Sequence, residues 1–335
     1  PSSLGKFGGD TDNWMWPRHT CDFSVFRVYA DPDNMPAEYN ENNRPYSPKF
    51  IAEVSAQGYQ DKDFAMTIGF PGRTDRYLLS WGGQQRIESI NKPRIEVRGI
   101  KQEIWQKAMQ SDDAIRIKYA SKYAGSSNYW KNSIGMNRGL ANLNVIERKQ
   151  QEEETFDRWA QSSDKKEQYG DVLHTLQEGY QSTYEKRQYL TYLSYALPNG
   201  PETIRLTRIF GQIDNKNLSA IEIEEIMTDR IRPFFKDYEP ELDKKVLAAM
   251  MKIVKELVPA EYLPDIYPEI DKKYKGDYER YANDLFAQTA ILSEDKIIEL
   301  LKNQKKYDKY TQKEPAAQLS LSVIMTIMDI AQSVS

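Results

Sequence analysis

The pattern of apolar and polar positions changes character near residue 74. Before that point, short β-branched and aromatic runs alternate with loops rich in Pro, Asn and Gly, which is typical of strands. These runs predict strands at residues 23–29, 50–54 and 64–68. From Thr74, a predicted N-cap, apolar residues recur at helical spacing. We therefore expect a β-type segment over residues 1–73 and a mainly α-helical domain over 74–335.

Punctuating residues divide the helical pattern. Pro93 predicts a kink or a break in the first helix, because proline lacks the backbone N–H that a helix interior needs. The Gly-Ser-Ser-Asn run at 125–128 predicts the end of a helix that begins near Asp112. Apolar residues between 242 and 257 fall on one helical stripe. Further helices are predicted at residues 129–154, 168–197, 294–302 and 319–330.

The length of 335 residues exceeds the usual size of one hydrophobic core, which agrees with two domains. Three or four strands cannot close a barrel or bury two faces by themselves. The β-type segment should therefore pair with strands from elsewhere. The chain begins Pro-Ser-Ser without a methionine, and we expect it to be a fragment of a longer protein.

Composition excludes some classes of protein. A net charge of −4 argues against a general nucleic-acid binder, whose affinity comes from basic residues near phosphates. The single cysteine excludes a framework of intramolecular disulfides. No apolar run reaches the roughly 20 residues that a membrane-spanning helix requires. We therefore expect neither nucleic acid nor a membrane as a partner.

The loop at residues 8–24 is the densest in candidate chemistry, with two tryptophans, His19 and Asp22. On the residues alone, a local turn contact explains Asp22 beside His19 about as well as catalysis does. A serine-type site also needs a nucleophile in a Gly-x-Ser-Gly loop, which this sequence lacks. A calcium loop at 214–225 is not expected, because Lys216 and Leu218 occupy ligand positions and the turn glycine is absent. No metal or organic cofactor is predicted.

A family resemblance enters at the same loop. Residues 9–20, Gly-Asp-Thr-Asp-Asn-Trp-Met-Trp-Pro-Arg-His-Thr, with Asp-Phe-Ser at 22–24, closely resemble a signature of bacterial serine dipeptidyl-peptidases of the dipeptidyl-peptidase 7 and 11 type. Residues 69–74 and 125–130 resemble the same family. The resemblance covers the chain to about residue 140. Beyond that, only the helical character agrees.

This resemblance implies a chymotrypsin-like double β-barrel with a large α-helical domain inserted in it. Residues 1–73 would be part of the catalytic domain, and 74–335 the inserted domain that caps the cleft. The expected fold class is therefore mixed, a partial chymotrypsin-like β-barrel segment followed by a mainly α-helical domain. The resemblance also implies a periplasmic location and a homodimer.

The resemblance assigns roles to four residues. Asp22 matches the aspartate of the catalytic triad, whose histidine and serine would lie outside this chain. Asn13 and Asn128 match two asparagines that bind the N-terminal ammonium of the substrate, and Trp14 would wall the same pocket. Amide oxygens suit this task, because they accept the hydrogen bonds of an ammonium without a second charge to desolvate.

The expected function is that of a serine exopeptidase fragment, whose parent protein releases dipeptides from the free N-terminus of oligopeptides. This chain would supply the triad aspartate and part of the ammonium site, and would be inactive alone. The alternative is a non-enzymatic helical module that binds peptides or proteins. The preferred residue before the scissile bond, acidic or hydrophobic, would depend on a residue beyond this chain.

Overall fold

The computed structural model describes residues 13–15, 25–66, 68–70, 72–162, 164–215 and 218–334. The chain divides into two compact units, Pro1–Arg76 and Tyr77–Ser335. Each unit is described by itself below, beginning with the first.

A short hairpin is the regular structure among the described residues of the first unit. Strands β1 (Tyr29–Ala30) and β2 (Arg44–Pro45) pair antiparallel, with Tyr29 opposite Pro45. The turn after β1 is held by Asp31, whose side chain accepts hydrogen bonds from the backbone N–H groups of Asp33 at 2.9 Å and Met35 at 2.8 Å. An aspartate in this position mimics a backbone turn.

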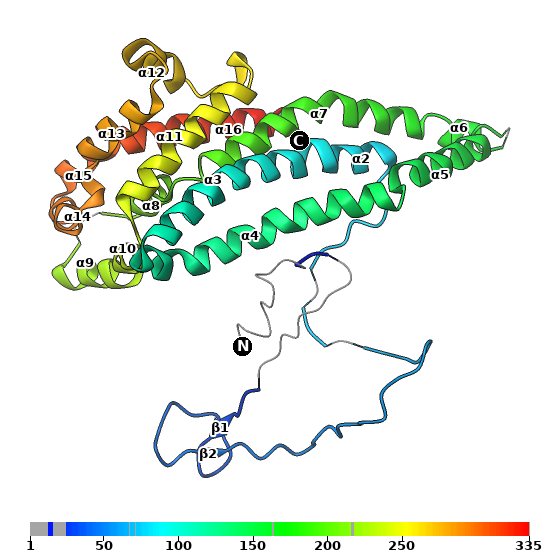
Figure 1. Ribbon diagram of the computed structural model, residues 1–335, viewed down its shortest axis with the longest axis horizontal. Helices are drawn as coiled ribbons and strands as arrows, with labels where there is room; N and C mark the ends of the chain where they lie inside the picture. The colour runs from blue at the N-terminus through cyan, green and yellow to red at the C-terminus, as the bar shows by residue number, and fades with distance from the viewer. Residues whose placement is uncertain are drawn as a thin grey trace. The chain divides into compact units, whose positions relative to one another are not determined.

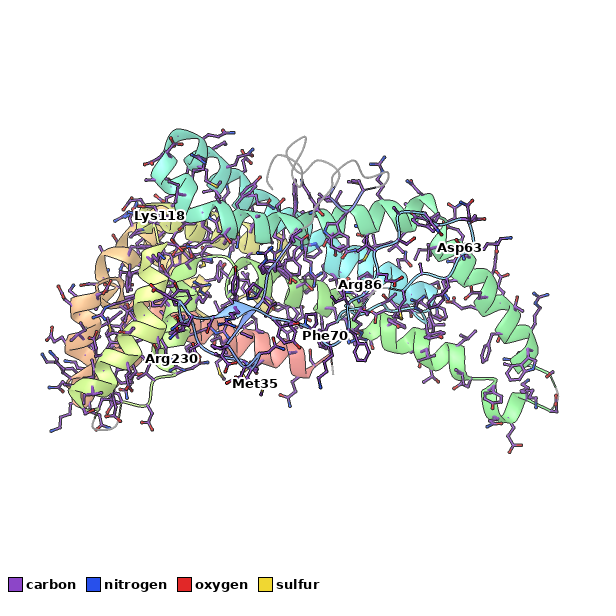
Figure 2. All side chains as sticks on the ribbon, turned by 90° about the horizontal axis from the view of Figure 1, so that it is seen from below. Met35, Asp63, Phe70, Arg86, Lys118 and Arg230 are labelled. Carbon is purple, nitrogen blue, oxygen red and sulfur yellow. The ribbon has the colours of Figure 1, made fainter. Side chains whose placement is uncertain are left out.

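The predicted partial chymotrypsin-like β-barrel is wrong for this structure. Among the described residues of this unit, β1 and β2 are the strands, and the segments 50–54 and 64–66 are irregular. Their apolar side chains face solvent, with exposed fractions of 91% for Phe50, 97% for Val54 and 90% for Phe64. Met35 and Phe70, labelled in Figure 2, are also exposed. A β-prone sequence forms a sheet only where a partner strand and a buried face exist, and these segments have neither.

The second unit is built of helices (Figure 1). In its first part these are α2 (Ser80–Gln85), η1 (Arg86–Asn91), α3 (Lys92–Ser111), α4 (Asp113–Asn142), α5 (Val145–Ala160), α6 (Lys166–Tyr169) and α7 (Val172–Ala196). They are followed by α8 (Glu202–Gly211), α9 (Ala220–Ile226), η2 (Met227–Ile231), α10 (Arg232–Lys236), α11 (Pro240–Leu257) and η3 (Ala260–Tyr262). The last are α12 (Ile266–Tyr274), α13 (Tyr278–Gln288), η4 (Ala290–Leu292), α14 (Glu294–Leu301), α15 (Gln304–Lys313) and α16 (Pro315–Gln332).

The first helix begins later than Thr74, at Ser80, and a distant residue caps it. Glu153 of α5 accepts hydrogen bonds from the backbone N–H of Ser80 at 2.5 Å and from its hydroxyl at 2.7 Å. Both residues are buried. A carboxylate at a helix N-terminus satisfies N–H groups that have no partner within the helix and interacts favourably with the helix dipole. The N-terminus of α2 is thereby tied to α5.

Pro93 does not break the helix that contains it. The π-helical turn η1 lies directly before α3 and joins it to α2, with helical backbone angles at the junction residue Asn91. A π turn widens the helix locally, which accommodates a proline without an N–H to donate. Ser89, in this turn, donates a hydrogen bond to the carbonyl oxygen of Tyr184 at 3.0 Å and so fixes η1 against α7.

The predicted helix end at residues 125–128 is also wrong. Helix α4 runs without a break for 30 residues, capped by Asp112, whose side chain accepts from the backbone N–H of Ala114 at 2.7 Å. Ser126 and Ser127 are buried. Small side chains let neighbouring helices approach closely, so tertiary packing overrides the local tendency of this run to form a turn. In Figure 1, α3 lies between α4 and α7, and it contacts both.

Two hydrophobic clusters form the core of the second unit. The larger joins α3, α4, α7, α8, α11, α12, α13 and α16, and includes the predicted stripe of α11. The smaller joins α8, α9, η2, α10, η4, α14 and α15. Helices with apolar faces of this kind derive most of their stability from such packing.

A buried polar network crosses this core at the N-terminus of α8. Asp243 of α11 is 2% exposed. Its carboxylate accepts hydrogen bonds from the backbone N–H groups of Glu202 at 2.6 Å and Thr203 at 2.8 Å. The hydroxyls of Thr203 and Tyr238 donate to it at 2.5 and 3.2 Å. Asp243 therefore caps α8 from another helix.

The same network reaches α4 through Glu202. The Glu202 carboxylate accepts from the hydroxyl of Tyr119 and from the ammonium of Lys122, each at 2.6 Å. Burial and, second, the negative charge of Glu202 raise the pKa of Asp243 from 3.8 to about 6, against the opposing effect of hydrogen bonds from Thr203 and from the Glu202 N–H. The network thus connects α4, α8 and α11 through two buried carboxylates.

We expect Asp243→Ala to lower the free energy of unfolding by about 3 kcal/mol, because buried N–H and hydroxyl donors lose their acceptor. Urea unfolding followed by circular dichroism measures this loss. The control is Asp113→Ala, which removes an exposed carboxylate of α4 and should change stability by less than about 0.5 kcal/mol.

The protonation of Asp243 predicts that the stability of the protein depends on pH. The pKa of Asp243 is raised from 3.8 to about 6, so the folded state binds the proton more tightly than the unfolded state. Its stabilising effect is complete below about pH 4 and is lost as the pH rises through about 6. The free energy of unfolding of wild type, measured relative to that of Asp243→Asn, should therefore rise by about 2–3 kcal/mol from pH 7 to pH 4. The variant lacks the titrating group, so it serves as the reference at both pH values. A difference independent of pH would contradict this assignment.

Candidate functional site

The predicted site residues fall in both units. Asn13 and Trp14 form a described turn of the first unit, and Trp14 has a φ of 60°, in the left-handed region. Such a backbone conformation is uncommon for a tryptophan. The Trp14 side chain is about half exposed, with 46% of its surface accessible. Asp22, and with it His19, lies outside the described residues.

Asn128 lies in the middle of α4, on its exposed surface. The helix places it on a rigid element, which suits a residue that must hold a ligand group in one position. The neighbouring residues bind this part of α4 to α3. Ser126 accepts a hydrogen bond from the guanidinium of Arg98 at 3.1 Å, and Trp130 donates its indole N–H to the carbonyl oxygen of Ile95 at 3.0 Å.

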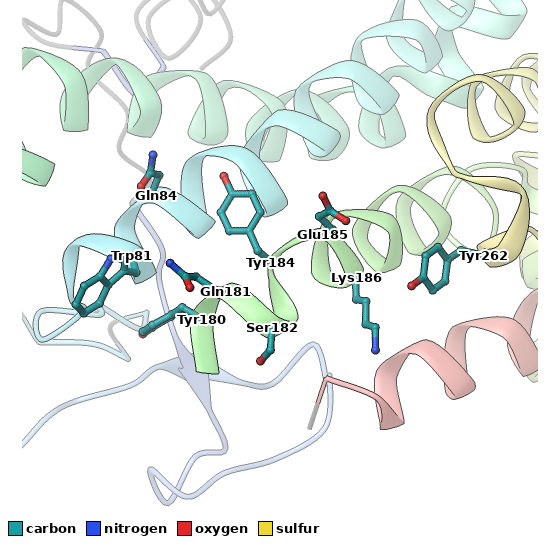
Figure 3. Close-up of a pocket in the computed structure, with 9 residues that line it drawn as sticks. All are labelled: Trp81, Gln84, Tyr180, Gln181, Ser182, Tyr184, Glu185, Lys186 and Tyr262. Atoms are coloured by element: carbon teal, nitrogen blue, oxygen red, sulfur yellow. The ribbon is translucent and has the colours of Figure 1, made fainter. Parts of the chain in front are cut away.

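A groove of about 440 Å³ opens on the second unit, away from Asn128 in sequence. It is formed by α2, α7 and η3, and Figure 3 shows its side chains. These are Trp81, Gln84, Tyr180, Gln181, Ser182, Tyr184, Glu185, Lys186 and Tyr262. Gly82 of α2 contacts Tyr180, a residue of this groove, so closely that a Cβ at position 82 would lie 2.6 Å from the hydroxyl oxygen of Tyr180. Asn128, the predicted site residue of this unit, is not among the described residues that line the groove.

No metal site is found among the residues that the structure describes, where no three His, Cys, Asp or Glu side chains are grouped suitably. His174 lies on the surface of α7, 3.7 Å from Glu178 and 4.0 Å from Asp171. This is an exposed arrangement within a single helix. In the described part of the chain, no helix is both long and apolar enough to cross a membrane.

The peptidase S46 family model matches residues 1–334. The chain belongs to the peptidase S46 family. The family resemblance expected from residues 9–24 is thus confirmed. The chain is 54% identical over 327 residues to the dipeptidyl-peptidase 7 of Porphyromonas gingivalis, covering 97% of this chain and 45% of that protein. It is 35% identical over 299 residues to the Asp/Glu-specific dipeptidyl-peptidase of Flavobacterium psychrophilum, covering 87% of this chain and 41% of that protein.

Solved structures agree with this S46 assignment. The crystal structure of Porphyromonas endodontalis DPP11 in complex with the dipeptide Arg-Asp matches with a TM-score of 0.78 and 32% identity, over 100% of this chain and 48% of that chain. The same protein in an alternate conformation matches with a TM-score of 0.54 and 27% identity, over 100% of this chain and 46% of that chain. This chain thus spans about half the length of the relatives it matches.

The S46 signature indicated where to look, but not how Asn128 is supported. The contact of Arg98 with Ser126 joins residues 28 positions apart, and that of Trp130 with Ile95 joins residues 35 apart. Local spacing could not reveal either contact. Gly99 offers no signal either, because a Cβ there would lie 3.6 Å from the indole nitrogen of Trp130, an ordinary van der Waals contact.

We expect Trp130→Phe to lower the free energy of unfolding by about 1 kcal/mol, because the ring still packs while its hydrogen bond to Ile95 is lost. Urea unfolding measures the change. Trp159→Phe is the matched control, because Trp159 is partly exposed and packs near Tyr169 at the end of α5. It should cost less than about 0.5 kcal/mol. Equal losses in both variants would mean that the Trp130 hydrogen bond does not stabilise the fold.

Proposed function

We propose that this chain is part of a serine exopeptidase that releases dipeptides from the free N-terminus of oligopeptides. The observation that supports this most is the family match over residues 1–334, together with 54% identity to a protein named dipeptidyl-peptidase 7. A related protein has been solved with the dipeptide Arg-Asp, which is the size of product that such an enzyme would release. The alternative, a purely binding module, has no comparable support.

The proposed mechanism gives Asp22 the role of the triad aspartate. It would hold a histidine in the tautomer that deprotonates the catalytic serine, and the histidine would later donate that proton to the leaving amine. The acyl-enzyme formed by the serine would then be hydrolysed by water. The histidine and the serine would come from parts of the protein outside this chain. We assign residues 1–73 to the catalytic domain and 74–335 to the helical domain.

Asn13 and Asn128 would bind the ammonium of the substrate, and Trp14 would wall its pocket. The physical basis is that amide oxygens accept hydrogen bonds from the ammonium. The surface position of Asn128 on a helix anchored to α3 supports such a role, because its backbone is fixed while its side chain faces outward. Binding of a charged amine explains why an exopeptidase would require a free N-terminus.

Substrate preference is a finer question within the same proposal. The identity to dipeptidyl-peptidase 7 of Porphyromonas gingivalis, 54%, exceeds the 35% identity to an Asp/Glu-specific relative. This supports a preference for a residue other than Asp or Glu before the scissile bond. A periplasmic location and a homodimeric state follow from the family and belong to the same proposal.

We expect this chain alone to be inactive, because it would lack the serine and the histidine. The measurement is release of the chromophore from a dipeptidyl-arylamide by the purified chain, compared with buffer. Hydrolysis above the buffer rate that disappears in Asp22→Ala would contradict the expectation. The complete protein serves as the positive control and should hydrolyse the same substrate.

In the complete protein, Asn128→Ala should lower kcat/KM for dipeptidyl-arylamides with a free amine. The expected loss corresponds to about 1.5–3 kcal/mol, the size of a hydrogen bond to a charged group. The control is Asn142→Ala at the C-terminal end of the same helix, which should leave kcat/KM unchanged. An unchanged specificity constant for Asn128→Ala would mean that this residue does not bind the ammonium.

A further inference from the structure

Two arginines of α3, one helical turn apart, share one aromatic ring. The guanidinium carbon of Arg94 lies 5.0 Å from the centre of the Tyr195 ring, and that of Arg98 lies 5.1 Å from the same centre. Arg98 also lies 5.1 Å from the centre of the Tyr129 ring on α4. Guanidinium groups stack favourably on aromatic faces, and three helices here bring two of them together.

Neither arginine has a carboxylate partner in the described part of the chain. Arg94 forms no ion pair or hydrogen bond there through its side chain. Arg98 donates to Ser126, at 3.1 Å to the hydroxyl and 3.5 Å to the carbonyl oxygen, and also has a polar interaction with the side chain of Tyr195. The Nε atoms of both arginines are buried without a hydrogen-bond partner. The carboxylate of Glu96, on the same helix, accepts a hydrogen bond from the hydroxyl of Tyr192.

This leaves two positive charges close to each other. Burial lowers the pKa of Arg98, and the charge of Arg94 lowers it further. An arginine nevertheless stays protonated in proteins, so the positive charge remains. Arg116 and Arg232, by contrast, are neutralised, the first by Asp113 at 3.0 Å and the second by Glu224 at 2.5 Å. Two partly buried guanidinium groups this close repel each other, and an anion bound between them would offset the repulsion.

We propose that Arg94 and Arg98 form a binding site for a carboxylate group of a peptide ligand. The planar donors of arginine match the two oxygens of a carboxylate, and the rings of Tyr129 and Tyr195 wall the site. Tyr129 is 55% exposed, so a ligand can reach it from solvent. The peptide nature of the ligand rests on the function proposed above.

The site lies beside the residue proposed to bind the ammonium. Tyr129 follows Asn128 directly on α4, and Ser126, which contacts Arg98, precedes it by two positions. Peptides contain both a free amine and at least one carboxylate, and α4 would contact both. The carboxylate has two sources in a peptide, the C-terminus and an acidic side chain.

The test uses three N-acetylated probes and calorimetric titration of the complete protein. N-acetyl-tetraalanine offers a C-terminal carboxylate, its C-terminal amide offers none, and N-acetyl-Ala-Glu-Ala-Ala-amide offers a side-chain carboxylate only. Acetylation removes the ammonium, so the probes bind without the proposed Asn128 contact and are not substrates. Binding is therefore measured independently of catalysis, which arylamide hydrolysis tests separately.

We expect at least one carboxylate probe to bind about tenfold more tightly than the amide, the scale of a charge-assisted hydrogen bond. The probe that gains affinity identifies the source of the carboxylate. In the double variant Arg94→Gln, Arg98→Gln this difference should disappear. Arg116→Gln, which removes an exposed and already paired arginine, should preserve it. Circular dichroism and thermal unfolding establish that the variants fold.

Arg94→Gln alone keeps the proposal testable if the double variant does not fold, because Arg94 makes no hydrogen bond to the described chain that its loss would break. Equal affinity of wild type for all three probes would overturn the proposal. So would a difference that persists in the variants. Equal affinities combined with a loss of thermal stability in Arg94→Gln would indicate that a carboxylate of the protein itself is the partner of the pair.

Discussion

The capping of α8 by Asp243 is the interaction on which the packing of the helical unit depends. The first N–H groups of a helix have no partner within it, and those of α8 are buried against α11. Asp243 supplies the acceptor, and Glu202 extends the contact to Tyr119 and Lys122 of α4. Lys101 of α3 adds a second contact, because its ammonium donates to the carbonyl oxygen of Asn199 at 2.7 Å. Asn199 lies just after the C-terminus of α7. Four helices are thereby held in one arrangement, including the one that contains Asn128.

The helical part of the fold was readable from the sequence wherever an apolar stripe alone determines the structure. The stripe between residues 242 and 257 became α11, because its apolar residues meet a continuous core. The strand predictions in the β-type segment were wrong for the opposite reason. Phe50 and Phe64 have side chains that favour strands, but they are exposed and no sheet forms around them in the described residues. The helix end predicted from the Gly-Ser-Ser-Asn run was wrong for a third reason, which is tertiary packing. Ser126 and Ser127, expected to end a helix, are buried within it.

The candidate site shows a similar division between what a motif and what a fold can reveal. The signature around Asn13 indicated the S46 family, and the family match confirms it. The supports of Asn128 could not be predicted, because Arg98 and Trp130 act across helices. A helical pattern reports neighbours three or four residues apart, whereas these contacts depend on the angle and separation of two packed helices. The hydrogen bond from Lys101 to Asn199, which are 98 positions apart in the sequence, could not be predicted for the same reason.

The treatment of buried charge separates structural residues from candidate binding residues. Burial lowers the pKa of Lys101 to about 8, yet its ammonium still finds a carbonyl oxygen and lies 4.6 Å from the centre of the Trp105 ring. Glu202 faces Lys122, and Asp243 accepts four hydrogen bonds. These charges are satisfied within the fold, so their role in it is explained. Arg94 and Arg98 have no such carboxylate in the described residues, although they lie in the same helix as Lys101. Two guanidinium groups without a carboxylate, brought together on one aromatic ring, are the feature of this unit that the proposed carboxylate ligand would explain.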